Sequence, residues 1–281
     1  MRKANITFLT LVLLFCALYA EFELRSLTIS ITLNPDGTAH AVEEARLFIT
    51  GEQSINLYQQ SRVFNDLSTW INRTGISDLR THASRAYVEL SELQVRSESV
   101  DSCNNIAQTC YATLVLDYDV YPINNQSSGI VDMDMYKPRT TKFSLRNEVF
   151  AFNRSKTDDI ILSQGTSIEI TVPDEATRLT FSKVPDNFDE AEKELFRFDS
   201  KTGNNYYVGN MRNFVWSGQT LSQFGMSYEI EQSLEEEITR FFSYLQKKIF
   251  DTLFSYAGIA YILATLSILL SFIWLHSLES K

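Results

Sequence analysis

The feature that most constrains this chain is an uncharged, apolar segment near its C-terminus. Leu253–Leu275 contains 23 consecutive residues without Asp, Glu, Lys or Arg. A helix rises about 1.5 Å per residue, so this length is enough to cross the hydrocarbon core of a bilayer. Tyr256 and Trp274 lie near the two ends, where aromatic side chains favour the membrane–water interface. The segment therefore predicts a transmembrane helix, followed by a short tail over residues 276–281.

The N-terminus has the layout of a secretory signal peptide. Two basic residues precede an apolar stretch over residues 6–19, and Ala20 then precedes the first acidic residue. Leu18 is larger than the small residue usual at that place before a cleavage site, so a retained signal anchor over 1–20 stays an alternative. A signal at one end and a span at the other predict a single-pass type I protein of the cell membrane. The bulk of the chain is then extracytoplasmic, and the short tail is cytoplasmic.

The region between these ends is predicted to be rich in β-strands. Apolar side chains alternate with polar ones from Leu27 to Leu33, and Ala39–Ile49 returns as a second strand after the turn Asn34-Pro35-Asp36-Gly37. Similar runs follow at 86–96, 111–121, 141–152, 167–172, 178–183, 205–208, 213–216 and 224–230. Short helices are predicted only at 66–72 and 188–196. Residues 21–232 therefore predict an antiparallel β-sandwich, as one large lobe or two small ones with a seam near 122–138.

The first hairpin resembles the start of predicted prokaryotic membrane proteins that carry an extracytoplasmic β-domain. Their first strands show the pattern I-x-I-x-(x)-DG-(S/T)-x-x-V-x-E. The matching residues are Ile29, Ile31, Asp36, Gly37, Thr38, Val42 and Glu44. The resemblance covers about twenty-five residues. It implies a membrane-tethered, surface-facing module and no particular activity.

Residues 233–252 predict an amphipathic stalk helix that runs into the span. Ser233 and Glu236 have the spacing of a capping box, and apolar residues then follow at helical spacing. Within the span, small residues recur three and four positions apart on one helical face, and such a face allows helices to approach closely in lipid. These residues are Ala257, Ala260, Ala264, Ser267 and Ser271. The stripe predicts a protein partner or a homo-oligomer, whereas a passive anchor is the alternative.

Two of the three cysteines, Cys103 and Cys110, lie close together in the predicted extracytoplasmic region. Six residues separate them, whereas redox and zinc motifs commonly use a two-residue spacing. Disulfides persist outside the cytoplasm. The pair therefore predicts a local disulfide that closes the loop before the strand at 111–121.

The remaining sequence gives little support to catalysis. The net charge is −10 without a basic cluster, which excludes a nucleic-acid partner. Neither His40 nor His82 belongs to a recognisable catalytic motif, and Asp132-Met133-Asp134 is too short a match to indicate a metal–nucleotide site. No cofactor or metal site is predicted. Asn72, Asn125 and Asn153 begin candidate N-glycosylation sequons.

These observations favour a membrane-anchored extracytoplasmic binding or assembly module that is not an enzyme. A structural subunit of a larger secretion or glycosylation complex is the first alternative. An extracytoplasmic hydrolase or transferase that uses carboxylates is the second. A Ser-His-acid arrangement around His40 or His82 would favour that second alternative.

Overall fold

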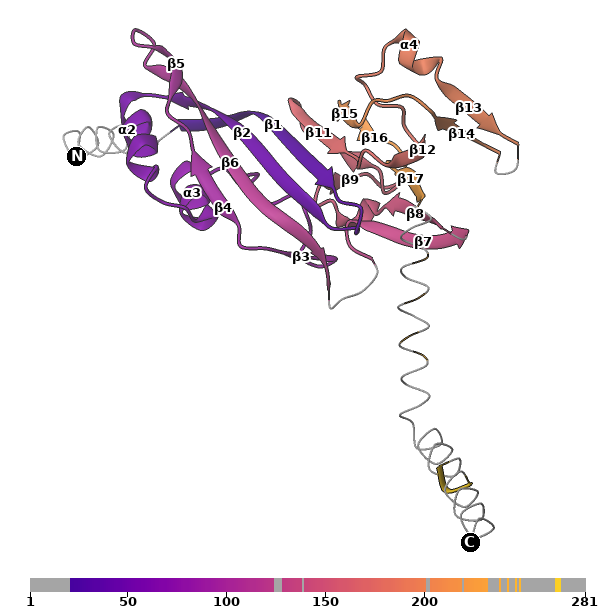
Figure 1. Ribbon diagram of the computed structural model, residues 1–281. Helices are drawn as coiled ribbons and strands as arrows, with labels where there is room; N and C mark the ends of the chain where they lie inside the picture. The colour runs from indigo at the N-terminus through magenta and orange to yellow at the C-terminus, as the bar shows by residue number, and fades with distance from the viewer. Residues whose placement is uncertain are drawn as a thin grey trace, which may run out of the picture. The chain divides into compact units, whose positions relative to one another are not determined.

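The computed structural model describes most of the chain between residues 21 and 231 (Figure 1). The described residues are 21–123, 128–137, 139–200, 203–218 and 220–231, with 238, 242, 246, 248 and 266–268. The predicted signal, most of the stalk and most of the predicted span lie outside them. Within this described part, no helix is long and apolar enough to cross a membrane. Chain contacts define two compact units, and the first holds the described residues of 21–136 and 140–231.

The first unit is mainly β, with largely antiparallel sheets, as predicted. Its largest sheet has the order β15-β11-β1-β2-β6-β3, and β4 and β5 also pair with β6 (Figure 1). The bounds are β1 Glu21–Leu33, β2 Ala39–Thr50, β3 Val88–Leu90, β4 Gln94–Ser97, β5 Asp101–Asn104, β6 Thr109–Pro122, β11 Thr166–Thr171 and β15 Asn213–Ser217. The long strands β1, β2 and β6 form its centre, so residues near their midpoints are covered by neighbouring strands on both sides.

The predicted first hairpin is confirmed, and its register follows from the alternation of apolar and polar residues. Leu27, Ile29 and Ile31 are all buried, whereas the intervening residues are partly exposed. Gly37 closes the turn with a φ of 84°, a left-handed conformation that glycine adopts without steric cost. On the other side of β1 the pairing is parallel, because Leu27 to Thr32 lie opposite Thr166 to Thr171 of β11. The sequence did not predict this parallel pair.

A second sheet has the order β13-β14-β12-β17-β8-β7, and a small three-stranded sheet has the order β16-β10-β9. Their bounds are β7 Val131–Lys137, β8 Thr140–Leu145, β9 Asn153–Arg154, β10 Ile160–Ile161, β12 Ala176–Phe181, β13 Phe196–Asp199, β14 Asn204–Tyr207, β16 Thr220–Leu221 and β17 Met226–Glu231. Aromatic contacts connect the two large sheets: the Phe181 ring of β12 lies 4.9 Å from the Phe214 ring of β15. Aromatic side chains bury large apolar areas, so this cluster contributes strongly to the core.

Two helices pack beside the β2–β6 part of the large sheet. Helix α3 (Leu67–Thr74) confirms the helix predicted at 66–72: Asp66 caps its first turn and Gly75 ends it at a φ of 70°. Helix α2 (Glu52–Ser61) was not predicted. Its buried face carries the fully buried Tyr58, whose hydroxyl proton is shared between the carbonyls of Glu98 at 2.8 Å and Thr113 at 3.1 Å.

Several predicted boundaries were wrong. The run 86–96 forms two short strands, β3 and β4, separated by residues 91–93. The run 141–152 forms only β8 before the 3-10 turn η2 (Asn147–Val149) interrupts it. The helix predicted at 188–196 shortens to α4 (Glu190–Lys193), because Phe196 begins β13. The predicted lobe seam near 122–138 includes residues outside the described part and stays a prediction.

Candidate functional site

The most unusual side chain in the core is Glu43, at the middle of β2. It is 0% exposed and points to the same face as Ala41 and Ala45, which are also buried. An isolated buried carboxylate is very costly unless hydrogen bonds and charge partners compensate for lost hydration. The small neighbouring alanines leave room on this face for such partners.

Two residues from distant parts of the chain supply these partners. The backbone N–H of His82 donates to Glu43 Oε1 at 2.6 Å, and His82 Nδ1 lies 2.7 Å from Glu43 Oε2. The Tyr118 hydroxyl of β6 also donates to Glu43 Oε1. Burial, followed by the neighbouring Glu43 carboxylate, raises the pKa of Tyr118 well above its ordinary value, so its hydroxyl stays protonated. We call Glu43, His82 and Tyr118 the buried triad.

The buried triad fixes the orientation of the His82 ring. An ionised carboxylate only accepts hydrogen bonds, so the ring proton lies on Nδ1 and Nε2 of a neutral ring is an acceptor. The Phe152 ring stacks on the imidazole at a centroid distance of 4.8 Å. Within the described part of the chain, Nε2 has no hydrogen-bond partner.

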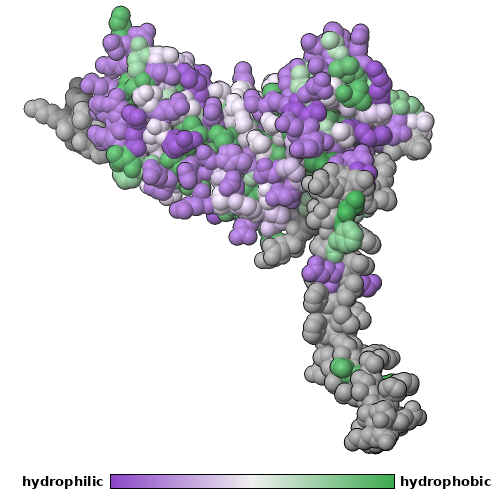
Figure 2. Space-filling model, viewed as in Figure 1, coloured by the Kyte–Doolittle hydropathy of each residue, from purple (hydrophilic) through white to green (hydrophobic). Residues whose placement is uncertain are grey.

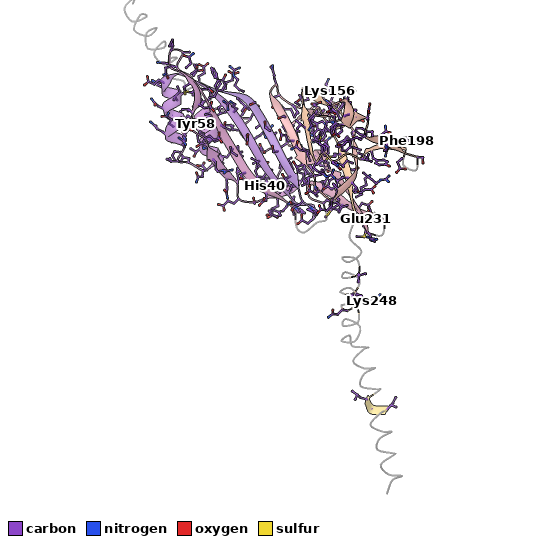
Figure 3. All side chains as sticks on the ribbon, turned by 45° about the horizontal axis from the view of Figure 1, so that its top comes forward. His40, Tyr58, Lys156, Phe198, Glu231 and Lys248 are labelled. Atoms are coloured by element: carbon purple, nitrogen blue, oxygen red, sulfur yellow. A yellow bond between two sulfur atoms is a disulfide. The ribbon has the colours of Figure 1, made fainter. Side chains whose placement is uncertain are left out.

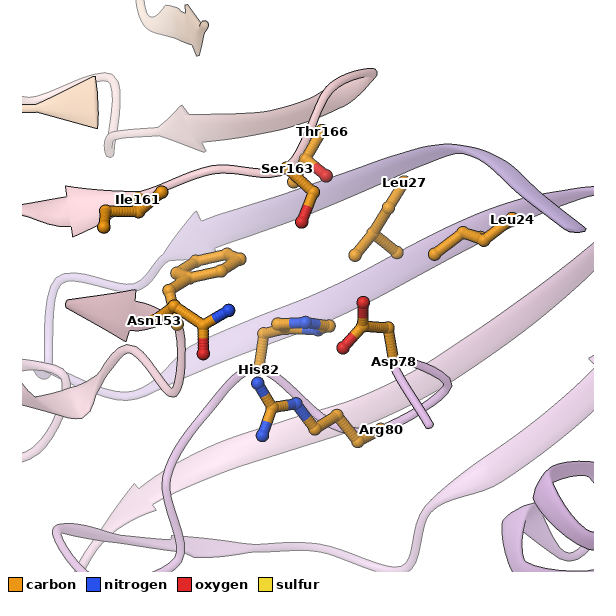
Figure 4. Close-up of a pocket in the computed structure, with 10 residues that line it drawn as sticks. Leu24, Leu27, Asp78, Arg80, His82, Asn153, Ile161, Ser163 and Thr166 are labelled. Atoms are coloured by element: carbon orange, nitrogen blue, oxygen red, sulfur yellow. The ribbon is translucent and has the colours of Figure 1, made fainter. Parts of the chain in front are cut away.

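His82 lines a small cavity at the junction of β1, β10 and the turn before β11 (Figure 4). The cavity measures about 20 Å³, which is room for roughly one water molecule. Its floor includes the buried His82, Leu27 and Thr166. Its exposed rim carries the polar residues Asp78, Arg80, Asn153 and Ser163. A buried histidine thus lines a small opening surrounded by hydrogen-bonding groups.

The predicted disulfide is present between Cys103 and Cys110, whose Cα atoms are 4.1 Å apart. It joins β5 to the start of β6 across a hairpin whose tip holds residues 105–108. Asn104 Oδ1 accepts from the backbone N–H groups of Ile106 and Ala107 within this tip. Ile106 is 97% exposed. A covalently closed hairpin therefore presents an apolar side chain to solvent.

We expect loss of this disulfide to lower the free energy of unfolding by about 2–3 kcal/mol, because the bond closes a short loop in the unfolded chain. The variant Cys103→Ala/Cys110→Ala tests this in urea unfolding of the full chain in detergent, followed by the fluorescence of buried Trp70 and Trp216. Intact mass of the unmodified chain should be about 2 Da below the reduced value. An unfolding midpoint unchanged by the double substitution contradicts this expectation.

The structure places the other predicted residues separately. Asn72 on α3 and Asn153 on β9 are exposed, whereas Asn125 lies outside the described residues. In the stripe of small residues predicted to lie in the membrane, only Ser267 is described, at a helical position. Asp132 and Asp134 lie on β7, and the described residues contain no cluster of three potential metal-ligating side chains.

The exposed faces carry the remaining charged groups. His40, labelled in Figure 3, is on β2. Its Nδ1 lies 2.9 Å from Asp119 and its Nε2 lies 3.6 Å from Asp117, both on β6. All three side chains are solvent-accessible, so this arrangement belongs to the hydrated face of the sheet. The face drawn in Figure 2 is mainly hydrophilic with scattered apolar residues. Neither feature forms an enclosed site.

Sequence reasoning missed the buried triad and its cavity. Residues 43, 82, 118 and 163 are far apart in the chain, and no local motif connects them. One signal was available: Glu43 occupies the apolar phase of β2, between Ala41 and Ala45. A charged residue in that phase indicates a buried polar contact.

Comparison with known proteins found no family model and no curated protein that matches this chain.

Proposed function

We propose that this chain is a single-pass, membrane-anchored extracytoplasmic module that binds or assembles with another cell-envelope component. The observation that carries this proposal is the disulfide-closed β5–β6 hairpin, which exposes Ile106 at its tip. Disulfides persist in oxidising compartments outside the cytoplasm. That location agrees with a signal at 1–20 and a type I span at 253–275.

The remaining parts of the proposal extend the sequence-based expectations. The two large sheets pack as a β-sandwich, which the contacts between Phe181 and Phe214 support. Residues 233–252 form a stalk helix that continues into the transmembrane helix. The resemblance of the first hairpin to membrane-tethered β-domains agrees with this arrangement. A structural subunit of a larger membrane complex is the alternative role for the same architecture.

The hairpin tip is proposed to bind a protein rather than a lipid surface. An apolar side chain becomes an interface anchor when it fills a pocket on a partner, and full burial of Ile contributes roughly 1.5–3 kcal/mol. Adhesion to an anionic membrane needs clustered Lys or Arg. Residues 101–110 contain neither.

We expect a photoreactive amino acid at position 106 to form a specific crosslink to a protein in native membranes. The matched control is position 63, because Val63 is also well exposed, at 77%. Equal crosslinking from both positions would indicate random collision and would refute the tip as the binding surface.

The membrane stripe is tested in the same crosslinked membranes. Ala264→Leu adds bulk to the face of small residues and should reduce crosslinked oligomers or partner complexes at least several-fold. Thr265→Leu adds similar bulk next to that stripe and serves as the control. If the protein stays monomeric and neither substitution changes its crosslinking, assembly through the span is contradicted.

A further inference from the structure

We propose that the His82 cavity is a catalytic site that hydrolyses short-chain carboxylic esters. Ser163 is the nucleophile and His82 is the general base. Glu43 is a positioning residue, because it acts on the substrate only through His82. This activity is separate from the binding role of the hairpin tip and does not depend on it.

The geometry brings the nucleophile and the base to one cavity. Ser163 begins the tight turn before β11, in which the Thr166 N–H donates to the Ser163 carbonyl at 3.0 Å. The Ser163 side chain is exposed at the cavity rim, and Figure 4 shows its hydroxyl directed toward the His82 ring. Across the described residues, this hydroxyl has no hydrogen-bond partner. Ser163 and His82 are not hydrogen-bonded to each other here, and such catalytic bonds often form only in the substrate complex.

The buried triad prepares His82 for proton transfer. Glu43 holds the Nδ1 proton, so the free Nε2 can accept the proton of a serine hydroxyl. The resulting imidazolium is stabilised by the buried Glu43 carboxylate only 2.7 Å away. In this role the carboxylate acts through His82, which lines the same cavity as Ser163.

The proposed reaction is an acyl transfer to water in two steps. Ser163 Oγ bonds to the ester carbonyl carbon while its proton moves to His82 Nε2, and the alcohol then leaves with that proton. Water attacks the resulting acyl-serine ester, again giving its proton to His82, which returns the proton to Ser163 Oγ as the acid departs. No oxidant, reductant or metal ion enters this balance.

The rim supplies groups for the developing oxyanion. The Arg80 guanidinium and the Asn153 side-chain amide both line the cavity. Arg80 has no ion-pair partner among the described residues, so its charge is available to a carbonyl oxygen that becomes negative. Asp78 lies on the same rim and disfavours anionic substrates. The chemistry therefore favours a neutral ester.

The cavity size limits the acyl group. A volume of about 20 Å³ admits little more than a methyl group beside the reacting carbonyl. We therefore assign the site to acetyl esters, with the alcohol part lying at the exposed rim.

The test uses the full chain in detergent with two probes, a fluorophosphonate and p-nitrophenyl esters of different chain lengths. Mass spectrometry should locate the fluorophosphonate on Ser163, and the acetate ester should react faster than the butyrate and octanoate esters. Ser163→Ala should abolish labelling and lower ester hydrolysis at least about 100-fold. Gln164→Ala, an exposed neighbour that does not line the cavity, should retain both activities.

The contribution of His82 is measured from the pH dependence of the fluorophosphonate labelling rate. Substitution of a residue that only stabilises the fold would leave this pH dependence unchanged in the folded protein. The labelling rate of the unmodified chain should depend on pH, and His82→Gln should remove this dependence. Near-ultraviolet circular dichroism identifies any His82→Gln sample that has not folded. The proposal is overturned if the folded, unmodified chain is not labelled, or if the Ser163→Ala variant hydrolyses esters and is labelled as the unmodified chain is.

Discussion

Replacing the buried carboxylate by its amide, Glu43→Gln, is expected to lower the free energy of unfolding by about 1–3 kcal/mol, the cost of leaving a buried donor without a partner. The amide has nearly the same shape, so little packing is lost. However, Gln offers one acceptor oxygen to three donors that Glu43 satisfies: the His82 N–H, the His82 Nδ1–H and the Tyr118 hydroxyl. At least one donor is left buried without a partner, and the amide nitrogen adds another donor.

Urea unfolding of the full chain in detergent measures this effect through the fluorescence of Trp70 and Trp216, which are both fully buried. The neighbouring substitution Glu44→Gln is the matched control, because Glu44 lies on the exposed face of the same strand. We expect that control to change stability by less than about 0.5 kcal/mol. Equal effects of the two substitutions would mean that the buried triad contributes nothing specific.

Tyr118→Phe separates the individual contacts. Removing the hydroxyl deletes one of the three donors, so Tyr118→Phe should cost less in the Glu43→Gln background than it does alone. Residues in one hydrogen-bond network typically show coupling energies of about 0.5–3 kcal/mol. A coupling energy near zero would place the Tyr118 bond outside the network.

The parts of the fold that local patterns specify were predictable from the sequence. The alternation from Leu27 to Leu33 and the turn ending at Gly37 specify the first hairpin. Asp66 and Gly75 mark the two ends of α3 through cap chemistry. In each case the residues that determine the element lie close together in the chain. The local sequence is therefore enough to predict the element.

The parts that depend on distant contacts were not predictable. Strand β11 pairs with β1 across about 139 positions, and no periodicity within either strand indicates its partner or the parallel direction. Helix α2 was missed because polar residues dominate it, although Tyr58 is buried. Likewise, Ser163 becomes a candidate only when the fold brings it to the cavity that His82 lines.

Gly165→Ala is expected to destabilise the chain by about 4 kcal/mol, as the sum of left-handed backbone strain and overpacking, each about 1–3 kcal/mol. Gly165 has a φ of 81°, and a Cβ built there would lie 2.5 Å from the Arg25 carbonyl oxygen. That contact is with backbone, so rotation of a side chain cannot relieve it. The turn must move away from β1, where the Leu27 N–H donates to the Gly165 carbonyl at 3.1 Å.

Gly75→Ala separates the two causes. Gly75 has a similar φ of 70°, but a Cβ there meets nothing within 4 Å. This control should therefore cost only about 1 kcal/mol, the penalty of the left-handed conformation itself. Both variants are compared by urea unfolding of the full chain in detergent. If the two variants lose the same free energy of unfolding, the close contact between the turn and β1 adds no cost to the substitution at Gly165. If Gly165→Ala also slows fluorophosphonate labelling of the folded protein, the close approach of this turn to β1 positions Ser163 as well as joining the parallel strands.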